Sequence, residues 1–157
     1  MKKKLFISNL AWDHKDFFKV EKLIKQYQFE GLDIAPLKIK NDWKNLNEIS
    51  KKNSKYFNHQ NIKINAIQGI FFKKNFNLFK KNKNHIEDIF NHTLNILKIC
   101  KIYKCEKVII GSSEFRKKGS INLKIADQIF INFFIKFKKI LNKKKDFFML
   151  GSYPTPI

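Results

Sequence analysis

The stretch KVIIG at residues 107–111 decides the fold class, because it carries consecutive branched apolar side chains between a lysine and a glycine. A nearly continuous apolar strand is typical of a parallel sheet, which is covered on both faces. A second strand of this kind is predicted at residues 146–150, DFFML. Between the two, apolar residues recur at helical spacing, at Ile125, Ile129, Phe133, Phe137 and Ile140. The order strand, helix, strand indicates a right-handed crossover.

The same alternation extends back to the N-terminus. Strands are predicted at residues 4–11, from Gly31 to Pro36, where the proline ends the regular pairing, and at residues 63–71. Helices are predicted at residues 16–27, within the polar stretch before residue 63, and from an N-cap at Asn84 with Glu87 three places on. We therefore predict an α/β protein with a single domain over residues 1–157.

Two architectures satisfy this order, an open doubly wound sheet and a barrel. A dinucleotide-binding doubly wound fold needs a glycine-rich turn after its first strand, and this chain reads AWDHKD there, at residues 11–16. We therefore predict a parallel β/α barrel of the TIM type that is incomplete, with about four to five β-α units.

The formal net charge of +20 is a value that would suit a partner such as nucleic acid or an anionic membrane surface. The lysines, however, are spread over nearly every segment, and Arg116 is the only arginine. Proteins that recognise bases and phosphates favour arginine, because its planar guanidinium group can donate to two acceptors at once. We interpret the charge mainly as compositional drift, with nucleic-acid binding as the alternative.

The N-terminal segment MKKKLFISNLAWDHKD begins with a basic head, but Ser8 and Asn9 interrupt its apolar run, which ends at Asp13. A strand is favoured over a secretory signal for this reason. No window approaches the ~18 consecutive apolar residues of a membrane span. Cys100 and Cys105 lack a second Cys/His pair, so neither a zinc site nor a disulfide framework is predicted. We predict a cytoplasmic protein without a membrane partner.

Five segments in order resemble the sugar-phosphate isomerase/epimerase group of xylose-isomerase-like β/α barrels. They are ISNLAW at 7–12, GLDIAPLKI at 31–39, INAIQGIFF at 64–72, NLF at 77–79 and VIIGSSEFRKKG at 108–119. The resemblance implies an eight-stranded barrel that binds a small sugar or sugar phosphate and moves a proton, usually with a divalent metal. Such barrels need about 250 residues, so this chain is expected to supply only the N-terminal portion.

The chain departs from the family at its metal site. In relatives the fifth strand ends in Glu-Pro-x-Pro, whose glutamate is a metal ligand. Here Gly151 stands where that carboxylate is expected, and Pro154 and Pro156 are displaced. The other family ligands would lie on strands six to eight. We therefore predict no metal ligand and no cofactor in this chain, although a complete family member is expected to hold a divalent metal.

The resemblance also implies site residues at the C-terminal strand ends. Asp33 matches an acidic position and is the candidate catalytic residue, a carboxylate that shuttles a proton, with a structural aspartate as the alternative. Six residues are candidates for substrate binding. Asn9 would make a polar contact, and Trp12 would pack against a sugar ring. Gln68 would bond to a hydroxyl, Gly111 would let the ligand approach the backbone, and Ser112 and Arg116 would bind an anionic group. Structural alternatives are a satisfied buried amide for Gln68 and a solvated or Glu114-paired guanidinium for Arg116.

Three functional hypotheses follow. The first is a sugar-phosphate isomerase/epimerase-like protein whose activity depends on the missing half of the barrel, so that enzymatic activity of this chain alone stays open. The second is a non-catalytic half-barrel whose open sheet edges favour a homo-oligomer or require a partner. The third is a basic nucleic-acid-binding relative of abasic-site endonucleases, which ranks last because the motifs favour the sugar-isomerase branch.

Overall fold

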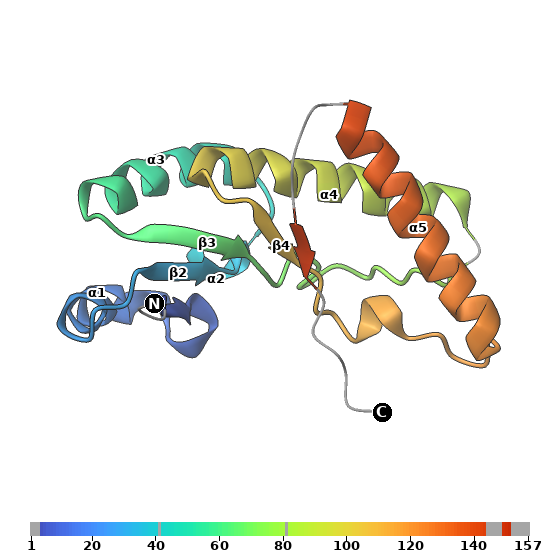
Figure 1. Cartoon of the computed structure of the whole chain (residues 1–157), viewed down its shortest axis with the longest axis horizontal. Coiled ribbons are helices and arrows are strands. Elements are labelled where there is room, and N and C mark those ends of the chain that lie inside the picture. Colours follow the sequence, from blue (N-terminus) through green and yellow to red (C-terminus); the bar gives the residue numbers. More distant parts are fainter. Residues whose placement is uncertain (1–3, 41, 81, 144–148, 152–157) are drawn as a thin grey trace.

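The structure, a computed structural model, describes residues 4–40, 42–80, 82–143 and 149–151 (Figure 1). The strands are β1 (Phe6–Ser8), β2 (Gly31–Ile34), β3 (Lys63–Ile67), β4 (Lys107–Ile109) and β5 (Met149–Gly151). The helices are α1 (Phe17–Gln26), α2 (Pro36–Ile39), α3 (Leu46–His59), α4 (Lys83–Tyr103) and α5 (Leu123–Lys143). Short 3-10 turns lie at Asn9–Ala11, His14–Asp16 and Glu114–Arg116.

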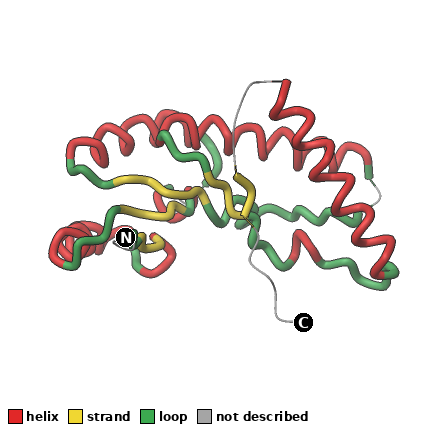
Figure 2. Tube along the Cα trace, viewed as in Figure 1, coloured by secondary structure: helices red, strands yellow, loops and turns green. Residues whose placement is uncertain are grey.

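The strands pair in chain order, β1-β2-β3-β4-β5, and every pair is parallel. Each connection between neighbouring strands runs through a helix, and α3 and α4 lie side by side along the sheet (Figures 1 and 2). A doubly wound sheet would place later strands on both sides of β1, whereas β1 here lies at the edge. The sequential order confirms the α/β class and the incomplete barrel.

The first two strands are shorter than predicted. Strand β1 ends at Ser8, because the Ser8 hydroxyl accepts a hydrogen bond from the Leu10 amide at 3.1 Å and starts a 3-10 turn. Strand β2 ends at Ile34, and Pro36, which was predicted to end the regular pairing, occupies the first turn of α2. Strand β3 ends at Ile67, and Gly69 then turns the chain with a φ of +60°.

The predicted N-cap of α4 is also wrong by two residues. Asn82 caps the helix, because its side-chain oxygen accepts from the amides of Asn84 at 2.9 Å and His85 at 3.4 Å. Strand β5 begins at Met149, and the earlier part of the predicted strand, residues 146–148, lies outside the described residues. The displaced prolines, Pro154 and Pro156, lie outside them as well.

The core lies where the strands meet the helices. Leu32, Ile34 and Val108 are at most 1% exposed. Helices α4 and α5 meet through Phe90 and Phe133, whose rings stack with centroids 4.8 Å apart. Burial of this apolar surface is the main stabilising contribution to the fold. None of the described helices is long and apolar enough to cross a bilayer.

Strands β2 and β3 approach so closely at one point that only glycine fits. Gly31 lies opposite Lys63, and a Cβ built on Gly31 would lie 1.8 Å from the Lys63 carbonyl oxygen. Because that oxygen belongs to the backbone, relief would require the strands to move apart. The contact fixes the register of the two strands that carry Asp33 and Gln68.

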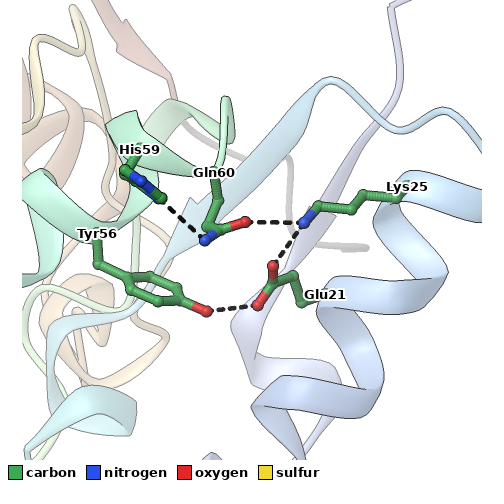
Figure 3. Close-up of polar contacts among 5 residues, drawn as sticks. All are labelled: Glu21, Lys25, Tyr56, His59 and Gln60. Carbon is green, nitrogen blue, oxygen red and sulfur yellow. Dashed lines mark hydrogen bonds and ion pairs between the residues drawn. The ribbon is translucent and has the colours of Figure 1, made fainter.

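A polar bridge joins α1 to α3 (Figure 3). The Tyr56 hydroxyl donates to Glu21 Oε2 at 2.5 Å, and Lys25 Nζ donates to Glu21 Oε1 at 2.7 Å and to Gln60 Oε1 at 2.8 Å. The hydrogen bond from Lys25, followed by that from Tyr56, lowers the pKa of the Glu21 carboxyl. The same bond from Tyr56 to Glu21 raises the pKa of the phenol. The bridge is therefore strongest at pH values above the pKa of Glu21 and below the pKa of Tyr56.

The Gly31→Ala variant is expected to lose about 3 kcal/mol of unfolding free energy, because the added methyl group forces β2 away from β3. Gly119→Ala is the matched control: its φ is +59° and a Cβ there would meet no atom within 4 Å. The control is expected to lose only about 1 kcal/mol, for the left-handed backbone. Urea unfolding monitored by circular dichroism measures both, and equal losses would contradict the close-approach argument.

The Glu21→Gln variant is expected to lose about 1 kcal/mol of unfolding free energy at neutral pH. Because the pKa of Glu21 is lowered in the folded protein, its contribution is present above the unfolded pKa and is lost as pH falls through the folded pKa. The difference between wild type and variant should therefore shrink under acid conditions. Glu87→Gln, at an exposed carboxylate of α4, is the control. A difference that does not vary with pH would contradict this account.

Candidate functional site

A hollow of about 530 Å³ opens at the C-terminal ends of β3 and β4. Two loops, after β3 and after β4, form its walls, and Gln68 lies between them. In β/α barrels this end of the strands carries the active site. The lining residues are Leu10, Gln68, Gly69, Ile70, Phe71, Phe72, Lys73, Lys74, Ile109, Gly111, Ser112, Ser113 and Glu114.

Gln68 links three strands at this end of the sheet. Its side-chain nitrogen donates to the Ser8 hydroxyl of β1 at 2.5 Å and to the Asp33 carbonyl of β2 at 3.2 Å. Its own backbone amide donates to the Ile34 carbonyl at 2.8 Å. With the nitrogen engaged and the residue only 8% exposed, Oε1 is the atom of this amide that a ligand hydroxyl can reach.

Asp33 lies on the same face of the sheet but not in the lining of the hollow. Its carboxylate Oδ1 accepts from Asn65 Nδ2 at 2.7 Å, and Asn65 Oδ1 accepts from Lys107 Nζ at 3.0 Å. This Asp33–Asn65–Lys107 chain crosses β2, β3 and β4. A register shift between Leu32 and Asp33 places Asp33 opposite Ala66, next to Asn65. The structure thus connects Asp33 to Gln68 through the Asp33 backbone carbonyl.

Asn65 and Lys107 were not among the site residues predicted from the sequence. Asn65 interrupts the apolar run KINAI in the middle of β3, and Lys107 begins β4. A polar side chain inside an apolar strand was the available signal. Pairing it with Lys107 required the strand register, which the sequence pattern does not give.

The loop after β4 contributes Gly111 and Ser112 to the hollow, whereas Arg116 is not among its lining residues. The Ser112 hydroxyl accepts from the Phe115 amide at 3.3 Å, and a hydroxyl that accepts one bond can still donate its proton. Arg116 Nε donates to the Ser112 carbonyl at 3.5 Å. Glu114 lines the hollow instead and pairs with Lys117 at 3.7 Å.

Asn9 and Trp12 line a separate cavity of about 210 Å³ among α1, α2 and α3. The Asn9 side chain donates to the Ala35 carbonyl at 3.1 Å and accepts from the Ala35 amide at 2.7 Å. This pair of bonds continues the β1–β2 pairing beyond the end of the strands. The structure therefore brings Gln68, Gly111 and Ser112 together and places Asn9 and Trp12 elsewhere.

Two ring nitrogens, from His92 and Trp43, hydrogen-bond to backbone carbonyls of residues 69–74, which form one wall of the hollow. His92 Nε2 lies 2.7 Å from the Ile70 carbonyl, and Trp43 Nε1 donates to the Phe72 carbonyl at 3.0 Å. The two rings pack edge to face, 4.6 Å apart. Burial, with a smaller contribution from the charge of Lys74, lowers the pKa of His92. His92 is therefore a neutral support for this loop at neutral pH.

Among the residues that the structure describes, no three His, Cys, Asp or Glu side chains gather closely enough to hold a metal ion. The polar groups of the hollow are amide, hydroxyl and backbone groups, with the charged side chains of Lys73, Lys74 and Glu114 at its wall. Such a set suits an uncharged polyol or an anion.

The His92→Gln variant is expected to flatten the pH dependence of stability. The unfolded imidazole takes up a proton near pH ~6.5, whereas the buried imidazole does so only at lower pH. Wild-type stability should therefore fall below about pH 6.5, by at most about 1.4 kcal/mol per pH unit, and this slope should be missing in H92Q. Chemical unfolding at several pH values measures the slope. His59→Gln, at an exposed histidine, should retain it; a slope that survives in H92Q would contradict the assignment.

No protein-family model matches the chain, and no curated protein does. Solved structures do match. A 3-keto-D-glucoside 4-epimerase, YcjR, from E. coli is 9% identical with a TM-score of 0.70, over 98% of this chain and 56% of that one. A sugar phosphate isomerase/epimerase from Parabacteroides distasonis is 12% identical with a TM-score of 0.65, over 97% and 51%. An AP endonuclease, family 2, from Brucella melitensis is 12% identical with a TM-score of 0.63, over 97% and 55%.

These likenesses concern the fold, because identities of 9 to 12% carry no residue roles. The chain spans about half the length of the structures that it matches. Another matching structure contains a xylose isomerase-like TIM barrel fused to a dioxygenase. The parallel strands in chain order agree with one side of such a barrel. The described part of this chain therefore has the fold of about half of a xylose-isomerase-like β/α barrel.

Proposed function

We propose that this chain forms half of the substrate mouth of a sugar or sugar-phosphate isomerase/epimerase-type barrel. The observation that carries the proposal is the position of Gln68. It lies in a hollow at the C-terminal strand ends, with its nitrogen held by β1 and β2 and its carbonyl oxygen available. A buried amide fixed in this way presents one acceptor in a defined direction, as recognition of a sugar hydroxyl requires.

The remaining lining suits the same class of ligand. Gly69 and Gly111 carry no side chain and allow a ligand to approach the backbone of both loops. The Ser112 hydroxyl can donate to a ligand oxygen. Lys73 and Lys74 supply positive charge at the wall, so a phosphate group would lie toward this side of the hollow.

Proton transfer, in this proposal, falls to Asp33, which is outside the lining of the hollow but is joined to Gln68 through its backbone carbonyl. Asn65 holds one carboxylate oxygen at 2.7 Å and leaves the other to act as the base that takes a proton from a substrate carbon. A complete barrel of this kind would use a divalent metal to polarise the adjacent oxygen. The described residues do not fit such an ion, because no three ligands gather. The proposal therefore assigns this chain binding and proton transfer, with activity depending on the rest of a barrel.

Nucleic-acid binding is a weaker second candidate. The net charge of +20 and the matching AP endonuclease support it. Against it, Arg116 lies against the Ser112 carbonyl, and the endonuclease matches no better than the sugar enzymes. DNA binding whose affinity falls steeply as the salt concentration rises would support this second candidate.

A cytoplasmic location is part of the same proposal. Cys100 and Cys105 are buried as free thiols. Free thiols are typical of a reducing compartment.

The test is binding of aldose and ketose phosphates to the chain, measured by calorimetry. Gln68→Ala is expected to weaken the tightest ligand about five- to tenfold, because one hydrogen bond to a fixed acceptor is lost. Asn91→Ala removes an exposed amide from α4 and should leave affinity unchanged. Asp33→Asn should retain affinity within about twofold while abolishing exchange of ligand C–H for deuterium wherever the wild type supports it. Equal affinity for Q68A and wild type would reject the proposed mouth.

A further inference from the structure

Exposed apolar side chains are concentrated on the first and last long helices. Among the described residues, α3 and α4 expose no large apolar side chain, whereas the segments of α1 and α5 expose several: Phe18, Leu23, Tyr27, Leu123, Ile125, Ile131 and Ile135, at 45 to 70%. These two helices lie at opposite ends of the row of helices (Figure 1). An exposed surface of this kind indicates a missing neighbour.

On α5 two of these side chains point away from α4. Phe133 stacks on Phe90 of α4 at 4.8 Å, and Lys136 Nζ lies 4.8 Å from the centre of the same ring. At 100° per residue, Ile131 and Ile135 lie about 160° round the helix from Phe133 and at least about 100° from Lys136. Leu123 and Ile125 lie only about 80° from Phe133, on opposite sides of it. We name Ile131 and Ile135 the α5 flank.

Helix α1 has the same asymmetry. Its contacts with α3 run through Phe17, whose ring lies 5.7 Å from that of Phe57, and through Glu21 and Lys25. Leu23 and Tyr27, 45% and 61% exposed, lie more than about 100° round the helix from that side. We name these two residues the α1 flank. Beside the two flanks, β1 and β5 are the edges of the described sheet.

We propose that a second copy of this chain covers both flanks. In this arrangement the α5 flank and β5 of each copy lie against the α1 flank and β1 of the other. A contact between two different surfaces repeats round an axis until the ring closes. Because the chain covers 51 to 56% of the barrels that it matches, two copies complete one turn.

The apolar area is sufficient for a stable pair. The four flank side chains expose roughly 100 Å² each, about 400 Å² per copy. A standard interface contributes about 800 Å² per partner, of which a little over half is apolar. The flanks therefore supply most of the apolar share of such an interface. They are separate from the hollow, so the pairing stands or falls independently of sugar binding.

The net charge opposes this pairing and makes its strength depend on salt concentration. Each copy carries +20, so two copies repel each other at low ionic strength. Salt at about 0.5 M shortens the screening distance to a few Å and weakens this repulsion, while burial of the flanks persists. Association should therefore strengthen with salt, in contrast to binding of an anionic partner, which weakens.

Sedimentation equilibrium of the purified chain, at about 1 to 200 µM and at low and high salt, tests the proposal. We expect a monomer–dimer equilibrium that tightens with salt. Ile131→Gln/Ile135→Gln should raise the dissociation constant at least tenfold, since two interface side chains lose apolar contact. Ile125→Gln is the matched control: it is 57% exposed on the same helix but lies outside the α5 flank, and should change the constant less than twofold.

Three outcomes would overturn the proposal. They are a wild-type chain that stays monomeric throughout this range, a dimer that weakens with salt, and a dimer that I131Q/I135Q and I125Q affect equally. A monomer that instead binds a separate chain carrying later barrel strands would assign the flanks to that chain. Circular dichroism of each variant confirms that the fold is retained, so loss of association cannot reflect unfolding.

Discussion

Parallel pairing imposes one constraint on which the rest of this structure depends. Each strand must begin at the same edge of the sheet, so the chain has to return along the sheet before the next strand, and helices make each return here. All carboxyl ends consequently meet at one edge. The side chain of Gln68 can therefore reach both Ser8 and the Asp33 carbonyl although the residues are far apart in sequence.

The strands also separate two kinds of surface. Leu32 and Val108 enter the apolar core, whereas Asp33, Asn65 and Lys107 form a polar chain on the sheet. Such a chain adds little net stability, because its charged and amide groups exchange hydrogen bonds with water for hydrogen bonds with one another. The polar chain instead orients a side chain, because Asn65 fixes the direction of the Asp33 carboxylate. The apolar core thus stabilises the fold, and the polar chain orients Asp33.

The elements were predictable from the sequence, because helical and strand periodicities are local properties. Their ends were less so. Asn82 and Asn84 both fit an N-cap, and only the backbone geometry shows which asparagine accepts from two amides. For the site, Gln68, Gly111 and Ser112 line one hollow, since they follow adjacent strands. Asn9 and Arg116 have the right chemistry for ligands, but Asn9 bonds to Ala35 and Arg116 to Ser112. Such competition from nearby backbone is invisible in sequence.

The two uncovered features of this chain differ in physical character, and this difference separates assembly from recognition. The α1 and α5 flanks are apolar, so covering them releases free energy without directional requirements. The members of the polar chain on the sheet already hydrogen-bond to one another, so covering the chain contributes little attraction. A neighbour would therefore be held mainly through the flanks, while the hollow at the strand ends stays available to a ligand. If the same surface served both purposes, any ligand would compete with the neighbour; the placement of Gln68 away from the flanks avoids this competition.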